Sequence, residues 1–293
     1  MTAPPTPLTF QSGDGGQLRG DRRGDPADPM VLLLHGAGQT RHSWSRAATR
    51  LADAGFCALA VDLRGHGDSE PAADGDYTRH AFARDVLALR QQVGSLFGVV
   101  GASLGGISAL LADDECADAL AEALVLVDIA PRIEQDGAER ILEFMADRPD
   151  GFASLEEVAD ALAAYNPNRP RTRDLAGLSR NLRLGEDGRY RWHWDPALIN
   201  GPKSLVSDRD PAALRRAARQ LRIPCLLVRG RHSDLLTEDG VAEFRRLVPH
   251  AHHLDIHGAG HMVAGDSNDV FSDAVVDFLD LVWRQRAGRD RTA

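Results

Sequence analysis

Gly101-Ala102-Ser103-Leu104-Gly105 is the stretch of sequence that decides the fold. An apolar run at residues 97–100 precedes it, and a helical pattern at residues 103–112 follows it. Glycines two residues to either side of a serine allow a tight turn from a strand into a helix, because they relieve the crowding that this turn creates. A serine at the tip of such a turn projects its hydroxyl toward a substrate. The pentapeptide therefore makes Ser103 a candidate catalytic nucleophile, and the alternative at this point is a strand-to-helix turn that is merely packed with small residues. The motifs described below favour the nucleophile.

Short apolar runs elsewhere in the chain predict further buried strands. They are apolar on both faces and are followed closely by glycine or aspartate, as in parallel sheets. The runs occupy residues 31–34, 58–61, 97–100, 124–127 and 225–228. Helical patterns lie between most of them, at residues 44–54, 79–92 and 103–112. This alternation predicts an α/β fold with a mostly parallel, doubly wound sheet.

A hairpin and an insertion complete the predicted organisation. Residues 8–20, with glycines around Asp14, predict a hairpin that adds an antiparallel edge to the sheet. The alternation then breaks into helical segments, which we interpret as an inserted helical cap. We therefore divide the chain into a first core part at 1–130, the cap at 131–220 and a second core part at 221–293. The second core part is predicted to hold strands at 224–230 and 252–256 and helices at 237–247 and 269–283.

The composition favours a globular protein that acts on a small molecule. Of the 293 residues, 43% are hydrophobic and 26% are charged, which is close to globular averages. The formal net charge of −9 gives a nucleic acid or an anionic membrane no electrostatic reason to bind. We expect a small-molecule substrate and neither of those partners, and the sequence leaves open whether a homo-oligomer forms.

The cysteines and the absence of a targeting signal predict the compartment. Cys57, Cys116 and Cys225 are odd in number and lie in apolar segments, which indicates buried thiols rather than a disulfide framework. No apolar run approaches the length of a membrane span, and the first residues lack the pattern of a signal peptide. We therefore expect the protein in the cytoplasm.

Further motifs follow the predicted strands in order. His35-Gly36-Ala37-Gly38 follows the first core strand, and Asp62-Leu63-Arg64-Gly65-His66-Gly67-Asp68-Ser69 follows the second. Arg229-Gly230-Arg231-His232-Ser233-Asp234 and Gly258-Ala259-Gly260-His261 close the series after the pentapeptide. With this set the chain resembles the α/β-hydrolase family, in its serine-nucleophile branch with a helical cap. The resemblance covers nearly all of the chain outside its first residues and the cap.

The resemblance implies an oxyanion hole and a general base. The family builds the hole from the backbone N–H of the residue after the nucleophile and from one N–H in the loop after the first core strand. Here these donors are Leu104 and Ala37, and we expect His35 to hydrogen-bond backbone only. The general base is His261, because the family's histidine follows the last strand.

Two aspartates at strand ends are candidates for the acid that orients the histidine. Asp234, at the usual family position, is preferred, and Asp128, at a position that some members use, is the alternative. Asp62 and Asp68 are predicted to fix a loop. The remaining late histidines lack acidic or thiolate partners at metal-binding spacing, so we predict surface or packing roles and no metal. They are His250, His252, His253 and His257.

The implied function is acyl transfer to water through a Ser-His-Asp triad and an acyl-enzyme, with no cofactor. Ser103 stands where related epoxide hydrolases and dehalogenases carry an aspartate, which argues against alkyl-enzyme chemistry. We predict a small or medium apolar carboxylic ester or lactone as substrate, bound under a cap wall of Tyr165, Trp192 and Trp194. An alternative is that both tryptophans only pack the cap on the core. Other functions left open are hydrolysis of a carbon–carbon bond in a ring-cleavage diketone, ligand binding and biosynthetic tailoring.

Overall fold

The central feature of the fold is a mostly parallel β-sheet. The structure is a computed structural model that describes residues 4–165, 171–207, 210–257 and 269–289. Within these residues the sheet has eight strands in the order β1-β2-β4-β3-β5-β6-β9-β10. They are β1 Thr6–Gln11, β2 Gln17–Arg23, β3 Met30–Leu34, β4 Cys57–Val61, β5 Gly98–Ala102, β6 Ala123–Val127, β9 Cys225–Gly230 and β10 His252–Ile256. Strand β2 is antiparallel to both of its neighbours, and the other neighbouring strands are parallel. The predicted doubly wound sheet and its hairpin edge are confirmed.

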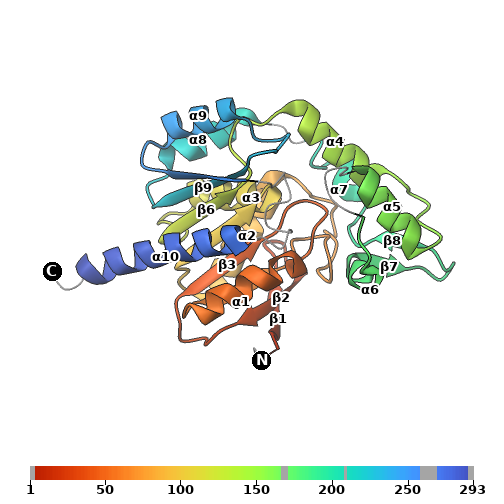
Figure 1. The fold of residues 1–293 in the computed structure, drawn as a ribbon, viewed down its shortest axis with the longest axis horizontal. Coiled ribbons are helices and arrows are strands. Elements are labelled where there is room, and N and C mark those ends of the chain that lie inside the picture. The colour runs from red at the N-terminus through yellow and green to blue at the C-terminus, as the bar shows by residue number, and fades with distance from the viewer. Residues whose placement is uncertain (1–3, 166–170, 208–209, 258–268, 290–293) are drawn as a thin grey trace.

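Helices cover both faces of this sheet (Figure 1). The core helices are α1 Ser45–Asp53, α2 Arg79–Val93, α3 Leu104–Glu115, α8 Pro211–Gln220, α9 Glu238–Leu247 and α10 Asp269–Arg289, and a short 3₁₀-helix, Arg41–Trp44, precedes α1. Helices α1 and α10 pack on one face, and α2, α3, α8 and α9 pack on the other. Successive side chains of a strand point to opposite faces. Val31 and Leu33 therefore pack against α1 and α10, whereas Leu32 and Leu34 pack on the face covered by α2, α3, α8 and α9. Burial on both faces explains why the strands are continuously apolar.

Most of the chain between β6 and β9, residues 135–200 without the undescribed 166–170, forms a separate group of elements on one side of the sheet, called the cap below (Figure 1). It contains α4 Gln135–Ala146, α5 Leu155–Tyr165, α6 Leu175–Leu178, a 3₁₀-turn Ser179–Asn181, β7 Leu182–Leu184, β8 Tyr190–Trp192 and α7 Ala197–Asn200. Helix α8, which the predicted boundary at residue 220 places in the cap, instead packs against α3 and α9. Its apolar residues, including Leu214, are buried in the core on the face of the sheet that α3 covers.

The chain order of the strands determines where a site can form. From β3 the chain continues to β4 on one side, whereas β5 lies on the other side of β3. Helices α1 and α3, which follow β3 and β5, cover opposite faces of the sheet, so the chain order reverses at β3, the kind of position at which open α/β sheets bind ligands. Leu34 is in register with Gly101, so the loop that begins at His35 lies beside the turn of Ser103.

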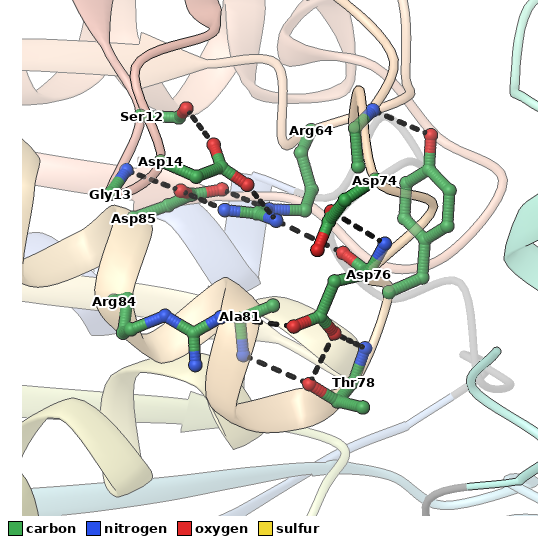
Figure 2. Close-up of polar contacts among 12 residues, drawn as sticks. Ser12, Gly13, Asp14, Arg64, Asp74, Asp76, Thr78, Ala81, Arg84 and Asp85 are labelled. Atoms are coloured by element: carbon green, nitrogen blue, oxygen red, sulfur yellow. Dashed lines mark hydrogen bonds and ion pairs between the residues drawn. The ribbon is translucent and has the colours of Figure 1, made fainter. Parts of the chain in front are cut away.

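A buried ion pair holds the loop after β4 against the hairpin and α2 (Figure 2). The Arg64 guanidinium binds the Asp85 carboxylate through two hydrogen bonds of 2.7 and 2.5 Å, and both side chains are almost fully buried. Arg64 also donates to the Asp14 carboxylate at 2.8 Å and to the Asp76 carbonyl at 2.9 Å. Asp85 accepts the Gly13 N–H at 2.8 Å. One side chain thus joins three segments that are distant in the sequence.

The cysteines are free thiols. Cys57 and Cys225 are buried in strands, as predicted. Cys116 is only partly buried, because it lies where the chain leaves α3. None of the described helices is both long and apolar enough to cross a membrane.

Candidate active site

Ser103 occupies a sharp turn between β5 and α3. Its backbone has φ 46° and ψ −113°, in the left-handed half of φ space that a non-glycine residue rarely adopts. The turn is held on both sides, because the Ser103 N–H donates to the Val127 carbonyl at 3.1 Å and the Ser103 carbonyl accepts the Ile107 N–H at 3.0 Å. Ser103 as a whole is only partly buried.

The flanking glycines are required by close backbone approach. A Cβ on Gly101 would lie 2.6 Å from the Gly105 backbone, and a Cβ on Gly105 would lie 2.3 Å from the Leu34 carbonyl oxygen. Real Cβ atoms do not approach backbone so closely, so neither site tolerates a side chain without moving a strand or helix. The relief of crowding that the sequence predicts at these two positions is confirmed.

The loop after β3 lies against the turn and leaves one backbone N–H unused. The Gly36 N–H donates to the Gln39 side chain at 3.0 Å, the Gly38 N–H to His66 Nε2 at 3.2 Å and the Gln39 N–H to the Gly36 carbonyl at 3.1 Å. Among the residues that the structure describes, the Ala37 N–H alone in this run has no acceptor. The first N–H of α3, that of Leu104, has no acceptor within its helix. Two donors are thus available beside Ser103.

Within the part of the chain that the structure describes, His35 hydrogen-bonds only backbone groups, as expected. Its Nδ1–H donates to the Gly36 carbonyl at 2.8 Å and its Nε2 accepts the Leu63 N–H at 3.0 Å. In the loop after β4, Asp62 accepts the N–H groups of Arg41 and Asp68 at 2.6 and 3.0 Å, which fits the predicted loop-fixing role. Asp68 binds Arg41 at 2.8 Å with a largely exposed carboxylate.

Asp128 is fully buried at the end of β6, the strand next to the nucleophile strand. Its backbone is also left-handed, at φ 53°. Its carboxylate accepts the Gly230 N–H at 3.1 Å and the Ser233 hydroxyl, both from the segment at the end of β9. Ser233 in turn accepts the N–H groups of Leu235 and Leu236 at 3.1 and 3.2 Å, which fixes its own position.

Asp234 occupies a different environment. Its carboxylate is half-exposed and forms an ion pair of 2.7 Å with Arg140 of α4. The loop backbone is close to the same helix, since a Cβ on Gly137 would lie 2.3 Å from the Asp234 carbonyl oxygen. Asp234 therefore joins the end of β9 to the cap.

His261 lies in the segment 258–268, outside the described residues. The strand that leads to it, β10, is paired with β9 at the same carboxyl edge of the sheet, with Ile256 opposite Gly230. The other late histidines make the contacts expected for surface or packing residues. His250 contacts the Ile223 carbonyl, His252 packs on Phe278, His253 contacts Asp255 and His257 contacts Arg231. No group of three or more potential metal ligands occurs among the described residues.

Aromatic side chains of the cap lie over the loop that carries Ala37. Trp192 and Trp194 stack with ring centroids 4.9 Å apart, and the Trp194 indole donates to the Met145 carbonyl at 3.2 Å. A Cβ on Gly38 would lie 3.4 Å from the Trp194 ring, so this tryptophan contacts the loop directly. Trp194 thus packs the cap on the core, as the alternative reading of the sequence has it, whereas the ring contacts of Trp192 are with Phe144, Phe152 and Trp194 of the cap, and a role of either tryptophan in substrate binding stays a prediction.

Tyr165 continues this aromatic cluster toward Asp234. It stacks on Phe144 at 4.2 Å, and Phe144 contacts Trp192 at 5.4 Å. Burial, with a smaller contribution from the Asp234 charge, raises the pKa of the Tyr165 hydroxyl to about 12. The phenol is therefore neutral at physiological pH.

Two residues at this site escaped the sequence analysis as functional candidates. Ser233 precedes the preferred acid and instead binds the alternative one. His193, which lies between the two tryptophans of the predicted cap wall, is buried and contacts the loops of both Gly38 and Gly67. The signal for His193 in the sequence is its position as a polar residue between Trp192 and Trp194.

Comparison with known proteins decides the family. The family model "Alpha/beta hydrolase family" matches residues 31–274, which is most of the chain. The chain belongs to the alpha/beta hydrolase family. This hydrolase is 32% identical to the esterase Rv0045c of Mycobacterium tuberculosis over 86% of its own length and 83% of the relative's. It is 26% identical to the 2-(acetamidomethylene)succinate hydrolase of Mesorhizobium japonicum, over 91% of its own length and 94% of the relative's.

The fold of this hydrolase also matches solved structures. A crystal structure of an alpha/beta hydrolase from Novosphingobium aromaticivorans superposes with a TM-score of 0.80 at 27% identity, covering 96% of this chain and 99% of the other. The expected family, fold and enzyme class are therefore confirmed, and the protein is a hydrolase.

Proposed function

We propose that this hydrolase cleaves a small or medium apolar carboxylic ester or lactone through Ser103 and an acyl-enzyme. The observation that carries the proposal is the placement of a strained, partly buried serine beside a loop in which the Ala37 N–H is left without an acceptor. Donors that are held in place before the reaction stabilise the negative charge that develops on the substrate oxygen. With the Leu104 N–H, the Ala37 N–H would form the oxyanion hole.

His261 is proposed as the base that removes the Ser103 proton. Strand β10 is separated from β5 by β9 and β6, which amounts to about 14 Å at about 4.8 Å per strand. The five residues from Ile256 to His261 can span at most about 17 Å. The histidine is therefore within reach of the serine, provided that the chain turns back across the edge of the sheet.

We propose Asp128, rather than Asp234, as the acid that orients His261. A triad carboxylate must stay ionised and must keep a fixed position in order to stabilise the imidazolium that forms. Asp128 is buried beside the nucleophile strand and is held by two donors, one from the last residue of β9 and one from the loop that follows it. Asp234 is half-exposed, and its charge is already balanced by Arg140.

The cap and the relatives support the proposed substrate class. The Trp194 ring and Met145, both apolar, lie over Gly38, and Phe144 and Tyr165 extend the aromatic surface. An apolar acyl or alkyl group matches such a surface. One relative bears the name esterase, which agrees with this class. In the proposed reaction His261 then activates a water molecule, which cleaves the acyl-enzyme and releases the acid.

Labelling with a fluorophosphonate followed by mass spectrometry tests the proposal. We expect a single adduct, on the peptide that contains Ser103, and loss of activity on short 4-nitrophenyl esters in parallel. Ser103→Ala should lower kcat by at least about 10⁴-fold. Ser108→Ala, which removes a buried hydroxyl on the same helix, is the matched control and should retain activity.

The outcomes are separable. An adduct elsewhere, or full esterase activity in Ser103→Ala, contradicts the proposal. Turnover of a ring-cleavage diketone without turnover of any ester would mean that the same residues catalyse carbon–carbon bond hydrolysis and not ester hydrolysis.

A further inference from the structure

A cluster of buried histidines lies beside the loop that carries Ala37. Among the described residues, His35, His66 and His193 are each at most 2% exposed. The rings of His35 and His66 are 5.0 Å apart, and those of His66 and His193 are 5.9 Å apart. The first two belong to core loops, whereas His193 follows β8 in the cap. The cluster therefore crosses the boundary between core and cap.

His193 contacts both core loops with its two ring nitrogens. Its Nδ1 accepts the Gly67 N–H at 2.7 Å, so the ring proton lies on Nε2, which donates to the Gly38 carbonyl at 3.3 Å. A neutral ring that accepts at one nitrogen must donate at the other, so these two bonds define one tautomer. This cap residue thus links the loop after β4 to the loop after β3.

His66 holds the other side of the same glycine. Its Nε2 accepts the Gly38 N–H at 3.2 Å, and its Nδ1–H donates to the Arg64 carbonyl at 2.9 Å. Gly38 is thereby fixed at its N–H from the core and at its carbonyl from the cap. It has φ 72°, a conformation that other residues adopt only with strain, and it directly follows Ala37. The orientation of the Ala37 peptide depends on how Gly38 is held.

We propose that His193 is a positioning residue that makes the oxyanion loop competent only while the cap is seated on the core. The inference rests on the proposed function, because it takes the Ala37 N–H as an oxyanion donor. When the cap is displaced, the Gly38 carbonyl and the Gly67 N–H lose their partner together. Gly38 then keeps only its hydrogen bond to His66, and the Ala37 N–H beside it is free to turn away from the developing oxyanion.

The surroundings keep the cluster neutral, as these bonds require. His193 faces His66, Arg183 of β7 and Asp68 of the loop after β4, and His35 faces His193 and Arg41. Burial, assisted by the neighbouring histidines and arginines, lowers the pKa of each of the three rings to about 3. A protonated ring could no longer accept the N–H of Gly67, Gly38 or Leu63.

Steady-state kinetics of His193→Phe provides the test. Phenylalanine retains the ring but removes both hydrogen bonds, and a poorly placed oxyanion donor should lower kcat by about tenfold to a hundredfold, with KM changed by less than about threefold. His193→Gln, which has an acceptor and a donor, should recover much of the loss. Val158→Ala is the matched control, because Val158 is buried in α5 of the cap. If His193→Phe keeps kcat within about twofold of that control, the proposal is overturned.

Nitrogen-15 spectra of the wild-type histidines provide a second readout, which also serves if His193→Phe does not fold. At pH 7 we expect a neutral Nε2–H tautomer for His193 and a neutral Nδ1–H tautomer for His66, with slow exchange of the Gly38 and Gly67 amides. The opposite tautomers, or charged rings, would overturn the inference. These signals do not depend on turnover, so failure of the inference is distinguishable from failure of the proposed esterase activity.

Discussion

Ser103 and Asp128 share an unusual property at the scale of single residues. Both follow the last residue of neighbouring parallel strands, and both have positive φ, at 46° and 53°. Strained non-glycine residues persist only where the surrounding structure holds them, and they cluster at functional sites. Here the Ser103 N–H binds the end of β6, and the Asp128 N–H binds the Val228 carbonyl of β9 at 2.7 Å. The end of β6 thus fixes Ser103, and the end of β9 fixes Asp128.

The two candidate acids can be told apart by single substitutions. Asp128→Asn should lower kcat by about 10⁴-fold, because an amide cannot stabilise the imidazolium and favours the wrong tautomer of the histidine. Asp234→Asn removes a half-exposed charge and should change kcat by less than about threefold. Initial rates on a 4-nitrophenyl ester measure both. The reverse order of effects would return the role to Asp234.

The glycine at the end of the pentapeptide can be tested through stability. Gly105→Ala places a Cβ against the Leu34 carbonyl, and we expect it to lower the free energy of unfolding by about 3 kcal/mol or more. Gly188→Ala is the control, since its φ is 74° but nothing lies near the new Cβ, so the cost should be about 1 kcal/mol. Urea unfolding of the two variants measures the difference. A loss of about 1 kcal/mol or less in Gly105→Ala would show that the chain relaxes around the new Cβ and would contradict the prediction.

At the scale of elements, one buried arginine determines how the hairpin, α2 and the loop after β4 fit together. Arg64 binds Asp85 of α2, Asp14 of the hairpin turn and the Asp76 carbonyl within the loop (Figure 2). Its own carbonyl accepts the His66 Nδ1–H, so the same residue supports the histidine that holds Gly38. The geometry of the oxyanion loop therefore depends on packing that lies well outside the site.

Removal of this arginine should be costly. Arg64→Met leaves the Asp85 carboxylate buried without its partner, and breaking a buried ion pair in this way lowers the free energy of unfolding by about 3–5 kcal/mol. Arg84→Met, in the neighbouring but exposed pair with Asp76, should cost less than about 1 kcal/mol. Denaturant unfolding of the two variants measures this difference in the free energy of unfolding. A loss in Arg64→Met as small as that in Arg84→Met would refute the prediction.

At the scale of the whole molecule, the buried histidines couple stability to pH. Their folded pKa values of about 3 lie below the usual value near 6.5, so the unfolded chain binds more protons between these limits. Their contribution to stability is complete above about pH 6.5 and is lost progressively as the pH falls toward 3. Each ring contributes a slope of up to about 1.4 kcal/mol per pH unit within this window.

His193→Phe, the variant that tests the positioning of the oxyanion loop, also tests this dependence of stability on pH. His193→Phe removes one such ring, so its stability between pH 5 and 6 should depend on pH less steeply, by up to about 1.4 kcal/mol per unit. Val158→Ala should keep the wild-type slope. Urea unfolding across this pH range gives both slopes, and identical slopes for all three proteins would mean that His193 is not buried and neutral in the folded state.

Much of the fold could be predicted from the sequence because its determinants are local or periodic. Apolar runs such as residues 31–34 are buried on both faces in any sheet that is covered on both sides, and the glycines of the pentapeptide permit a turn that few other residues allow. The assignment of α8 could not be predicted, because its pattern is that of any amphipathic helix. Only its packing on α3 separates it from the cap elements that precede it.

The sequence alone determined the α/β sheet, the turn at Ser103 and the order of the motifs around it, since backbone sterics and hydrophobic periodicity act over a few residues. The tertiary structure alone decided the environments of Asp128 and Asp234, one buried and anchored from β9, the other exposed and paired with Arg140. It also brought His193 to the Gly38 carbonyl, across 155 positions of the chain. Burial and partners at such separations depend on how layers pack, and no local pattern encodes them.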